Sequence, residues 1–202
     1  MVSGRGGEPE PILEGRAAQM ARSLATTARG HGLGEDEVGA LARAHVTAMT
    51  PRVEVLDDDH HPAYLHPGRS ALILLRDVGR VDVSVLVVAA LHESLDAHLR
   101  VGPEEIEERV GAAALEALAS IPRPGDERLV ERLLGLGPGL SLATVAERLD
   151  HLRHLHVRDD LMDVWADSYD EVLEAWLPFA RRVHPKLAVR YAHWARTFVK
   201  RI

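Results

Sequence analysis

A histidine and a glutamate stand side by side at the end of an apolar run. The stretch VLVVAALHESLD, residues 85–96, places His92 and Glu93 directly after seven apolar residues. Because a helix that is apolar on all sides must be surrounded by other helices, the pair is expected near the centre of the fold. A buried carboxylate needs a cationic partner or a metal ion, so these two residues are candidates for a site.

A helix expected over residues 141–156 supplies possible partners for this pair. One of its stripes is apolar, and a second recurs at positions i, i+4, i+7 and i+11 with Ala143, Glu147, Asp150 and His154. The second stripe has two interpretations: it is a solvated face of the helix, or it belongs to a metal site built from histidine and carboxylates in a bundle core. The chain has no cysteine, so any metal must be held by His, Asp and Glu.

The composition of the 202 residues excludes several classes of protein. Apolar residues make up 46% and charged residues 27%, which is typical of a globular protein. A net charge of −7 leaves no basic face for a polyanion, so no nucleic acid polymer is expected as a partner. No apolar run approaches the roughly 20 residues of a membrane helix, and the first twelve residues do not resemble a secretion signal. We therefore expect a cytoplasmic protein without a membrane partner.

Apolar residues recur at helical spacing along almost the whole chain, and no alternating strand pattern stands out. The first helix is marked by Leu13, Ala17, Met20 and Leu24, and the second by Val38, Leu41, His45 and Met49. A loop is expected over residues 50–63, because this stretch holds two prolines and three consecutive aspartates.

Caps and breakers divide the rest of the chain into further helices. Pro67 suits the first turn of a helix in HPGRSALILL, and Asp82 is placed to cap a helix over residues 83–91. Another helix begins at Pro103 and runs to the IPRPGD segment. Shorter helices are expected over 126–136 and 141–156, and two more on either side of Pro185. The prediction is an all-α bundle of about nine helices, with residues 1–11 as a flexible tail and residues 12–202 as a single domain.

Four segments of the chain, in order, resemble a known family. They are YLHPGRSALILL, AALHES, EEIEERVGAAALEAL and VAERLDHLR. They are similar to the YIxHP, LLHDxxED, glutamate-rich EERFG and LADRLHNLR segments of the HD-domain hydrolases of the RelA/SpoT alarmone type. The likeness extends to ALARAHVTAM upstream and AWLPFARRV downstream, and it covers roughly residues 38–195. This resemblance implies an HD-domain-like helical bundle.

The resemblance also assigns four residues to a metal site. His66 and His92 fall on the family's first and second metal ligands, Glu93 on the aspartate of its HD pair, and Glu147 on its last aspartate ligand. The family's metal is usually manganese, and its reaction removes the 3′-pyrophosphate from ppGpp. A divalent ion lowers the pKa of a bound water into a useful range for attack on phosphorus. The resemblance thus implies a Mn²⁺-dependent phosphohydrolase that acts on a small phosphorylated nucleotide.

The sequence departs from the family at positions that bear on catalysis. Both aspartate ligands are replaced by glutamate, which keeps the charge and adds a methylene to each arm. Where the family has Glu-Asp for water activation and proton transfer, this chain has Asp96 and Ala97. Asp96 lies one turn beyond His92 and is the candidate catalytic base.

The expected substrate contacts differ from the family as well. Thr50 and Pro51 stand where the family has an Arg-Lys pair, and Arg52, one step away, is the candidate substitute for binding substrate. His151 occupies the family's nucleotide-contacting asparagine position and is the second candidate substrate contact. The acidic run at residues 57–59 would repel a phosphorylated nucleotide unless it faces away from the site.

Two functions of different classes remain open from the sequence. The first is a metal-dependent phosphohydrolase, similar to the (p)ppGpp 3′-pyrophosphohydrolases. The second is a catalytically inactive HD fold that acts as a binding or regulatory protein, because the losses fall on the catalytic acid pair and the basic loop together. Geometry discriminates between them, since an active site requires Glu93, Glu147 and both histidine ligands, His66 and His92, to converge within about 2.0–2.6 Å of a common point. The sequence does not determine the oligomeric state.

Overall fold

The described part of the chain is helical and contains no strand, which confirms the predicted all-α fold. The computed structural model describes residues 13, 15–55, 65–96, 100–123, 125–155 and 159–200. The expected tail at residues 1–11 and the acidic run at residues 57–59 lie outside the described residues. Among the described helices, none is long and apolar enough to cross a membrane.

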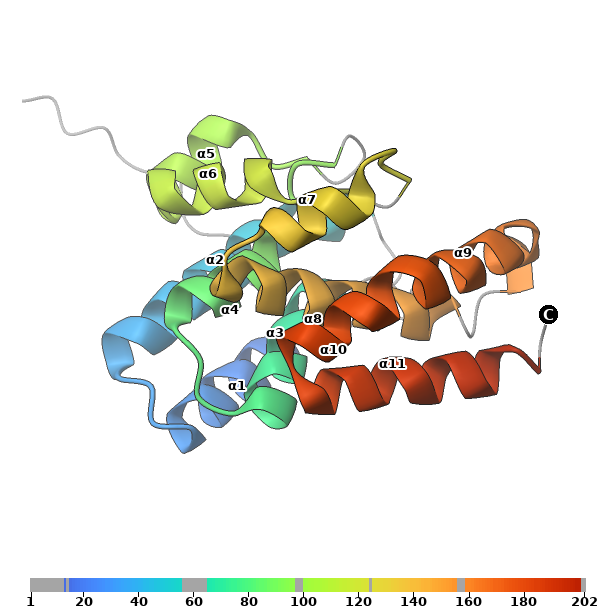
Figure 1. Cartoon of the computed structure of the whole chain (residues 1–202). Helices are drawn as coiled ribbons and strands as arrows, with labels where there is room; N and C mark the ends of the chain where they lie inside the picture. The colour runs from blue at the N-terminus through green and yellow to red at the C-terminus, as the bar shows by residue number, and fades with distance from the viewer. Residues whose placement is uncertain are drawn as a thin grey trace, which may run out of the picture.

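The helices follow one another with short connections (Figure 1). In chain order they are α1 (Gly15–Gly30), α2 (Glu35–Val55), α3 (His66–Ile73), the π-helical turn η1 (Leu74–Val78), α4 (Val83–Leu91), α5 (Pro103–Arg109), α6 (Ala112–Ser120), α7 (Leu129–Gly135), α8 (Pro138–Leu155), the 3₁₀ turn η2 (Asp159–Val164), α9 (Trp165–Glu171), the π-helical turn η3 (Val172–Trp176), α10 (Leu177–Val183) and α11 (Pro185–Phe198).

Helix α4 is the centre of the bundle, as its apolar sequence predicts. Every residue from Val85 to Leu91 is buried, and the helix packs against α2, α3 and α8. Its N-terminus is capped by Asp82, whose carboxylate accepts a hydrogen bond from the backbone N–H of Ser84 at 2.9 Å. The C-terminal end of α4 therefore places His92 and Glu93, which follow it, next to the core, and His92 is itself buried.

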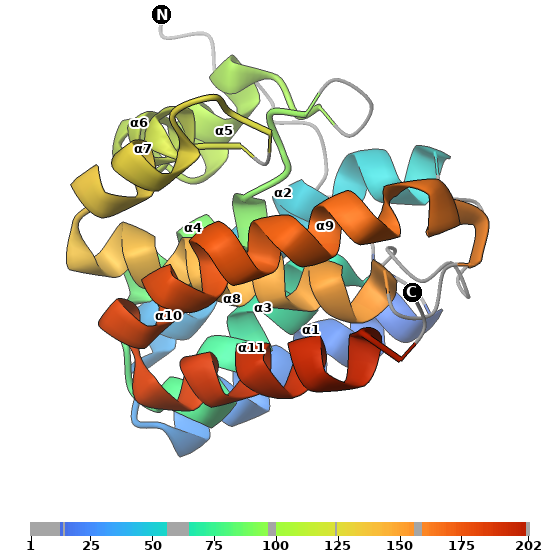
Figure 2. The ribbon, with the colours of Figure 1, turned by 45° about the vertical axis from the view of Figure 1, so that its right-hand side comes forward.

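Helix α8 lies beside α4 and is held there by the C-terminal helices. Tyr191 donates a hydrogen bond to the carbonyl of Val145 at 2.9 Å, and Trp194 donates one to the carbonyl of Leu152 at 2.7 Å. Both donors come from α11, which runs along α10 in Figure 2 and also contacts α8. All three tryptophans are buried, which agrees with a packing role for each.

The segment expected as one helix from Pro103 divides into α5 and α6. The break falls at Gly111, whose φ of 113° lies in the region that favours glycine and cannot continue a right-handed helix. The two short helices pack against each other near one end of the bundle (Figure 1), and α6 also contacts α4. The periodicity of the apolar residues did not predict this break, because helical spacing continues on both sides of the glycine.

Helices α1 and α3 approach each other closely at Gly68, which allows a stability prediction. A Cβ atom on Gly68 would lie 2.2 Å from Cγ of Met20 and 3.3 Å from Cε1 of His45. We expect Gly68→Ala to lower the free energy of unfolding by about 1–3 kcal/mol, as overpacking does in a filled core. Urea denaturation measures this change.

The matched control for this prediction is Gly135→Ala near the end of α7. A Cβ atom there meets nothing within 4 Å, so the substitution is expected to be neutral or slightly stabilising. If Gly68→Ala were as stable as the parent protein, the close approach of α1 and α3 would be wrong.

Candidate metal site

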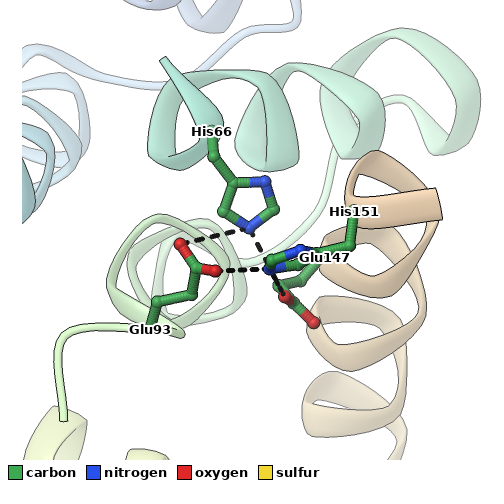
Figure 3. A group of neighbouring side chains, drawn as sticks. All are labelled: His66, Glu93, Glu147 and His151. Carbon is green, nitrogen blue, oxygen red and sulfur yellow. Dashed lines mark ion pairs between the residues drawn. The ribbon is translucent and has the colours of Figure 1, made fainter. Parts of the chain in front are cut away.

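Three helices bring two histidines and two glutamates together beside the core. His66 is the first residue of α3, Glu93 follows the end of α4, and Glu147 and His151 lie one turn apart on α8. Figure 3 shows the four side chains pointing toward one another. One ligand atom from each residue lies within 4.8 Å of all the others. Such a group is able to hold a divalent ion.

Several distances within the group fit ligands that share one ion, whereas Glu93 and His151 are in direct contact as an ion pair. Glu147 Oε1 lies 3.4 Å from Nε2 of His66 and 3.0 Å from Nε2 of His151. Glu93 Oε2 lies 3.8 Å from Nε2 of His66, and Glu93 also pairs with His151. Ligands that hold one ion at about 2.0–2.3 Å are separated by roughly 3–4.5 Å. Nitrogen and carboxylate oxygen donors of this kind suit Mn²⁺, Fe²⁺ or Zn²⁺.

The carboxylate of Asp150 fixes the orientation of the His66 ring. Nδ1 of His66 lies 2.9 Å from Oδ2 of Asp150, which is buried one turn after Glu147 on α8. Arg69 in turn donates from Nε to the same oxygen at 2.9 Å. A carboxylate on Nδ1 fixes the tautomer of a histidine and leaves Nε2 free to bind a metal. Nε2 is the nitrogen of His66 that faces the two glutamates.

The charges of the group are strongly coupled. Burial raises the pKa of Glu147, but the neighbouring histidines outweigh it and hold that pKa well below its ordinary value. Burial likewise raises the pKa of Glu93, and His66, His151 and Arg52 together lower it overall. Burial lowers the pKa of His151, yet the two carboxylates raise it to about 10. Without a metal, His151 is therefore protonated and pairs with the two ionised carboxylates, and an ion that enters the site would have to displace its proton.

His92 lies next to this group and has no hydrogen-bond partner in the described structure. Its side chain is buried, and its Nδ1 lies 3.4 Å from Oε2 of Glu147 without the geometry of a hydrogen bond. Burial is the main cause that lowers the pKa of His92 to about 4, so the ring is neutral at pH 7. A buried, neutral and unpaired imidazole is unfavourable unless something binds it. His92 therefore fits a ligand role at the edge of the group.

The three residues expected to contact water or substrate have other partners in this structure, and for His151 these are the two glutamates of the metal group. Arg52 is buried and forms an ion pair with Glu93, while its Nε and Nη1 have no hydrogen-bond partner. Asp96 is partly exposed and pairs with Nη1 of Arg123 at 2.9 Å. The roles that the resemblance implies for Arg52 and Asp96 therefore stay predictions. Ala97, where the family has its second acid, lies outside the described residues.

His45 is fully buried beside Arg52 and makes the protein's stability depend on pH. Burial lowers its pKa to about 4, and Arg52 adds to this effect. Above pH 6.5 the ring is neutral in both the folded and the unfolded chain; below it, the unfolded chain takes up a proton first. Stability from this group is therefore lost as the pH falls from about 6.5 to 4, by up to ~3 kcal/mol.

The prediction for His45 is tested by substitution with leucine. His45→Leu removes the titration, so its free energy of unfolding should fall less than that of the parent protein between pH 7 and pH 5. His193→Gln is the control, because it removes an exposed histidine from α11. An identical pH dependence in His45→Leu and the parent protein would contradict the burial of an unpaired ring.

The structure resolves the two interpretations of the polar stripe on α8. Glu147 and Asp150 are buried, and His154 is partly buried with its Nδ1 3.8 Å from Oδ2 of Asp150. The stripe is therefore not a solvated face. Helical spacing pointed to Asp150, which follows Glu147 by three residues, but nothing pointed to Arg69, whose contact with Asp150 joins residues 81 apart.

The comparison with solved structures supports the resemblance found in the sequence at the level of the all-α fold. Among solved structures, the chain is similar to a metazoan ortholog of SpoT that hydrolyzes ppGpp and plays a role in starvation responses. The two share 18% identity with a TM-score of 0.52, over 93% of this chain and 97% of that one. No family profile matches the sequence, and no curated protein matches it significantly.

Proposed function

We propose that the protein is a metal-dependent phosphohydrolase that acts on a small phosphorylated nucleotide of the ppGpp type. The observation that carries this proposal is the convergence of His66, Glu93, Glu147 and His151 from three helices, with ligand atoms within 4.8 Å of one another. Similarity of the fold to a protein that hydrolyzes ppGpp supports the choice of substrate class.

Each residue has a role in this proposal. His66, Glu93 and Glu147 would hold a divalent ion, Mn²⁺ being the first candidate, with His151 or His92 completing the set. The ion, when bound, supplies Lewis acidity toward the phosphate and a water of lowered pKa. Asp150 holds the ring of His66 in orientation, and Asp96, at the exposed end of the segment after α4, would accept a proton from water.

A second candidate function is a metal-free HD fold that binds a partner or regulates one. The observation that favours it is the pairing of Glu93 with Arg52 and of both glutamates with His151. These cations neutralise the carboxylates without an ion. In that case Arg52 replaces the metal as the counter-charge of Glu93, and added Mn²⁺ would have to displace it.

The experiment that tests the proposal is hydrolysis of ppGpp by the purified chain with increasing Mn²⁺. Chromatography of the nucleotide products should show GDP, which is the product of removing the 3′-pyrophosphate. Asp96→Asn is expected to lower kcat by about 10²–10⁴-fold, as loss of a catalytic base does, with little change in metal affinity. Glu116→Gln on the exposed side of α6 is the control and should retain full activity.

Two outcomes would contradict the phosphohydrolase. One is metal binding without hydrolysis of ppGpp or of any other phosphorylated nucleotide. The other is hydrolysis that Asp96→Asn and Glu147→Gln leave unchanged, because it would then come from a contaminating enzyme.

A further inference from the structure

A cavity lies beside α3, next to the metal group but lined by other residues. It has a volume of about 500 Å³ and is bounded by α1, α3 with η1, the end of α8, and α11. Figure 2 shows α1, α3 and α11 next to one another on this side of the bundle. None of the residues that the sequence predicted to bind metal, water or substrate lines this cavity. Its size falls within the range of small-molecule sites.

The cavity is lined by an unusual number of cations for an acidic protein. Its charged residues are Arg16, Arg69, Arg76, Arg153, Arg190 and Asp77. Five arginines face one aspartate here, whereas the chain as a whole has a net charge of −7. Arginine is the side chain best suited to bind phosphate, because its planar fork donates two parallel hydrogen bonds.

Acidic side chains near the cavity neutralise only part of the positive charge of its arginines. Asp77 is paired with Arg190, and the buried Asp150 receives a hydrogen bond from Arg69. Arg153 lies 3.7 Å from the same Asp150 and is exposed. Arg76 is exposed and forms no ion pair with the described residues. The lining therefore keeps an excess of positive charge that an anion can neutralise.

The cavity has a floor of buried and partly buried apolar side chains and a rim of more exposed arginines. Met20, Leu65, Leu72 and Ile73 contribute apolar side chains next to the arginines. A ligand that fits both parts carries phosphate groups at one end and an apolar or planar group at the other. Free inorganic phosphate would use the rim alone.

We propose that this arginine-lined cavity binds a small organic phosphate, at a site separate from the metal group. The phosphate groups contact the arginines, and the organic part packs on the apolar floor. The proposal does not depend on the phosphohydrolase activity. Arg69 belongs to the cavity and also contacts Asp150, which orients His66, so a ligand here lies two contacts from the metal group.

Isothermal titration calorimetry with ADP on the full chain tests the proposal. The protein is treated with EDTA, so that binding through a metal does not contribute. One ADP is expected to bind per chain, adenosine should give no measurable heat, and higher salt should weaken the binding. Arg16→Gln/Arg76→Gln removes two exposed cations of the cavity and should weaken ADP binding at least tenfold. Arg181→Gln/Arg182→Gln removes two exposed cations of α10 and should bind as the parent protein does.

The proposal is overturned by any of three results. They are the absence of ADP binding, equal ADP affinity in the parent protein and the cavity variant, and equal weakening in the cavity and control variants. Preference for a glutamate-rich peptide over ADP would also overturn it, because the occupant would then be a protein. Failure of the metal site leaves these measurements unchanged, since they are made without metal.

Discussion

Glu147→Gln is expected to lower the affinity of the protein for Mn²⁺ by at least about 100-fold. Removing a residue that only supports a ligand typically costs 10–100-fold in metal affinity, and Glu147 contacts both His66 and His151 directly. Glutamine has the same shape and lacks the charge, so the loss reports on ligation rather than on packing. Calorimetric titration of Mn²⁺ into EDTA-stripped and dialysed protein measures the affinity.

Two further variants make this result specific. Glu116→Gln, on the exposed side of α6, should bind Mn²⁺ as the parent protein does. Asp150→Asn should give an intermediate loss of about 10–100-fold, because it weakens the support of His66 and leaves the ligands in place. Equal affinity in Glu147→Gln and the parent protein would remove Glu147 from the metal site.

Glu93→Gln is expected to destabilise the metal-free protein by about 3–5 kcal/mol. Arg52 is only 1% exposed and has its one ion pair in the described structure with Glu93, so the substitution leaves a buried charge without a counter-ion. The second substitution Arg52→Met removes that charge and keeps an apolar side chain of similar length. Arg52→Met/Glu93→Gln should therefore be more stable than the sum of the two single changes predicts.

These four proteins form a double-mutant cycle. Urea denaturation in EDTA measures the free energy of unfolding of the parent protein, the two single variants and the double variant. The expected coupling energy is about 1–3 kcal/mol. The exposed pair Arg29 and Glu35, studied by the same substitutions, is the control and should show a much smaller coupling. Additive changes at Arg52 and Glu93 would mean that the buried ion pair does not form.

The fold could be predicted from the sequence because its main signals are local. The apolar run at residues 85–91 required a central helix, and α4 is that helix. Asp82 and Pro67 marked helix starts through chemistry that acts within one turn. Gly111 was different, since one glycine within a helical pattern does not by itself show whether the helix continues.

The site could be predicted only in part, because its geometry depends on contacts between distant residues. The identities of His66, Glu93 and Glu147 followed from the segments that resemble HD-domain hydrolases, and the structure brings these three side chains together. The inclusion of His151 in the group, and the pairing of Arg52 with Glu93, depend on how α2, α4 and α8 pack. No spacing within a single segment contains that information.

The balance between Arg52 and a metal ion determines which of the two candidate functions holds. The ion pair between Arg52 and Glu93 gives the carboxylate a counter-charge, while the buried ring of His92 has no hydrogen-bond partner among the described residues. The first observation favours a metal-free fold and the second favours a metal site. Both are properties of the same few side chains, so locating an ion directly decides between them.

The most direct test is a crystal structure of the chain grown with Mn²⁺, with anomalous-scattering data that locate manganese. We expect one strong peak about 2.0–2.3 Å from Nε2 of His66 and from oxygens of Glu93 and Glu147, with Arg52 displaced from Glu93. A map without a peak among these residues, and with Arg52 and His151 still paired to the two glutamates, would contradict the metal site and the phosphohydrolase built on it.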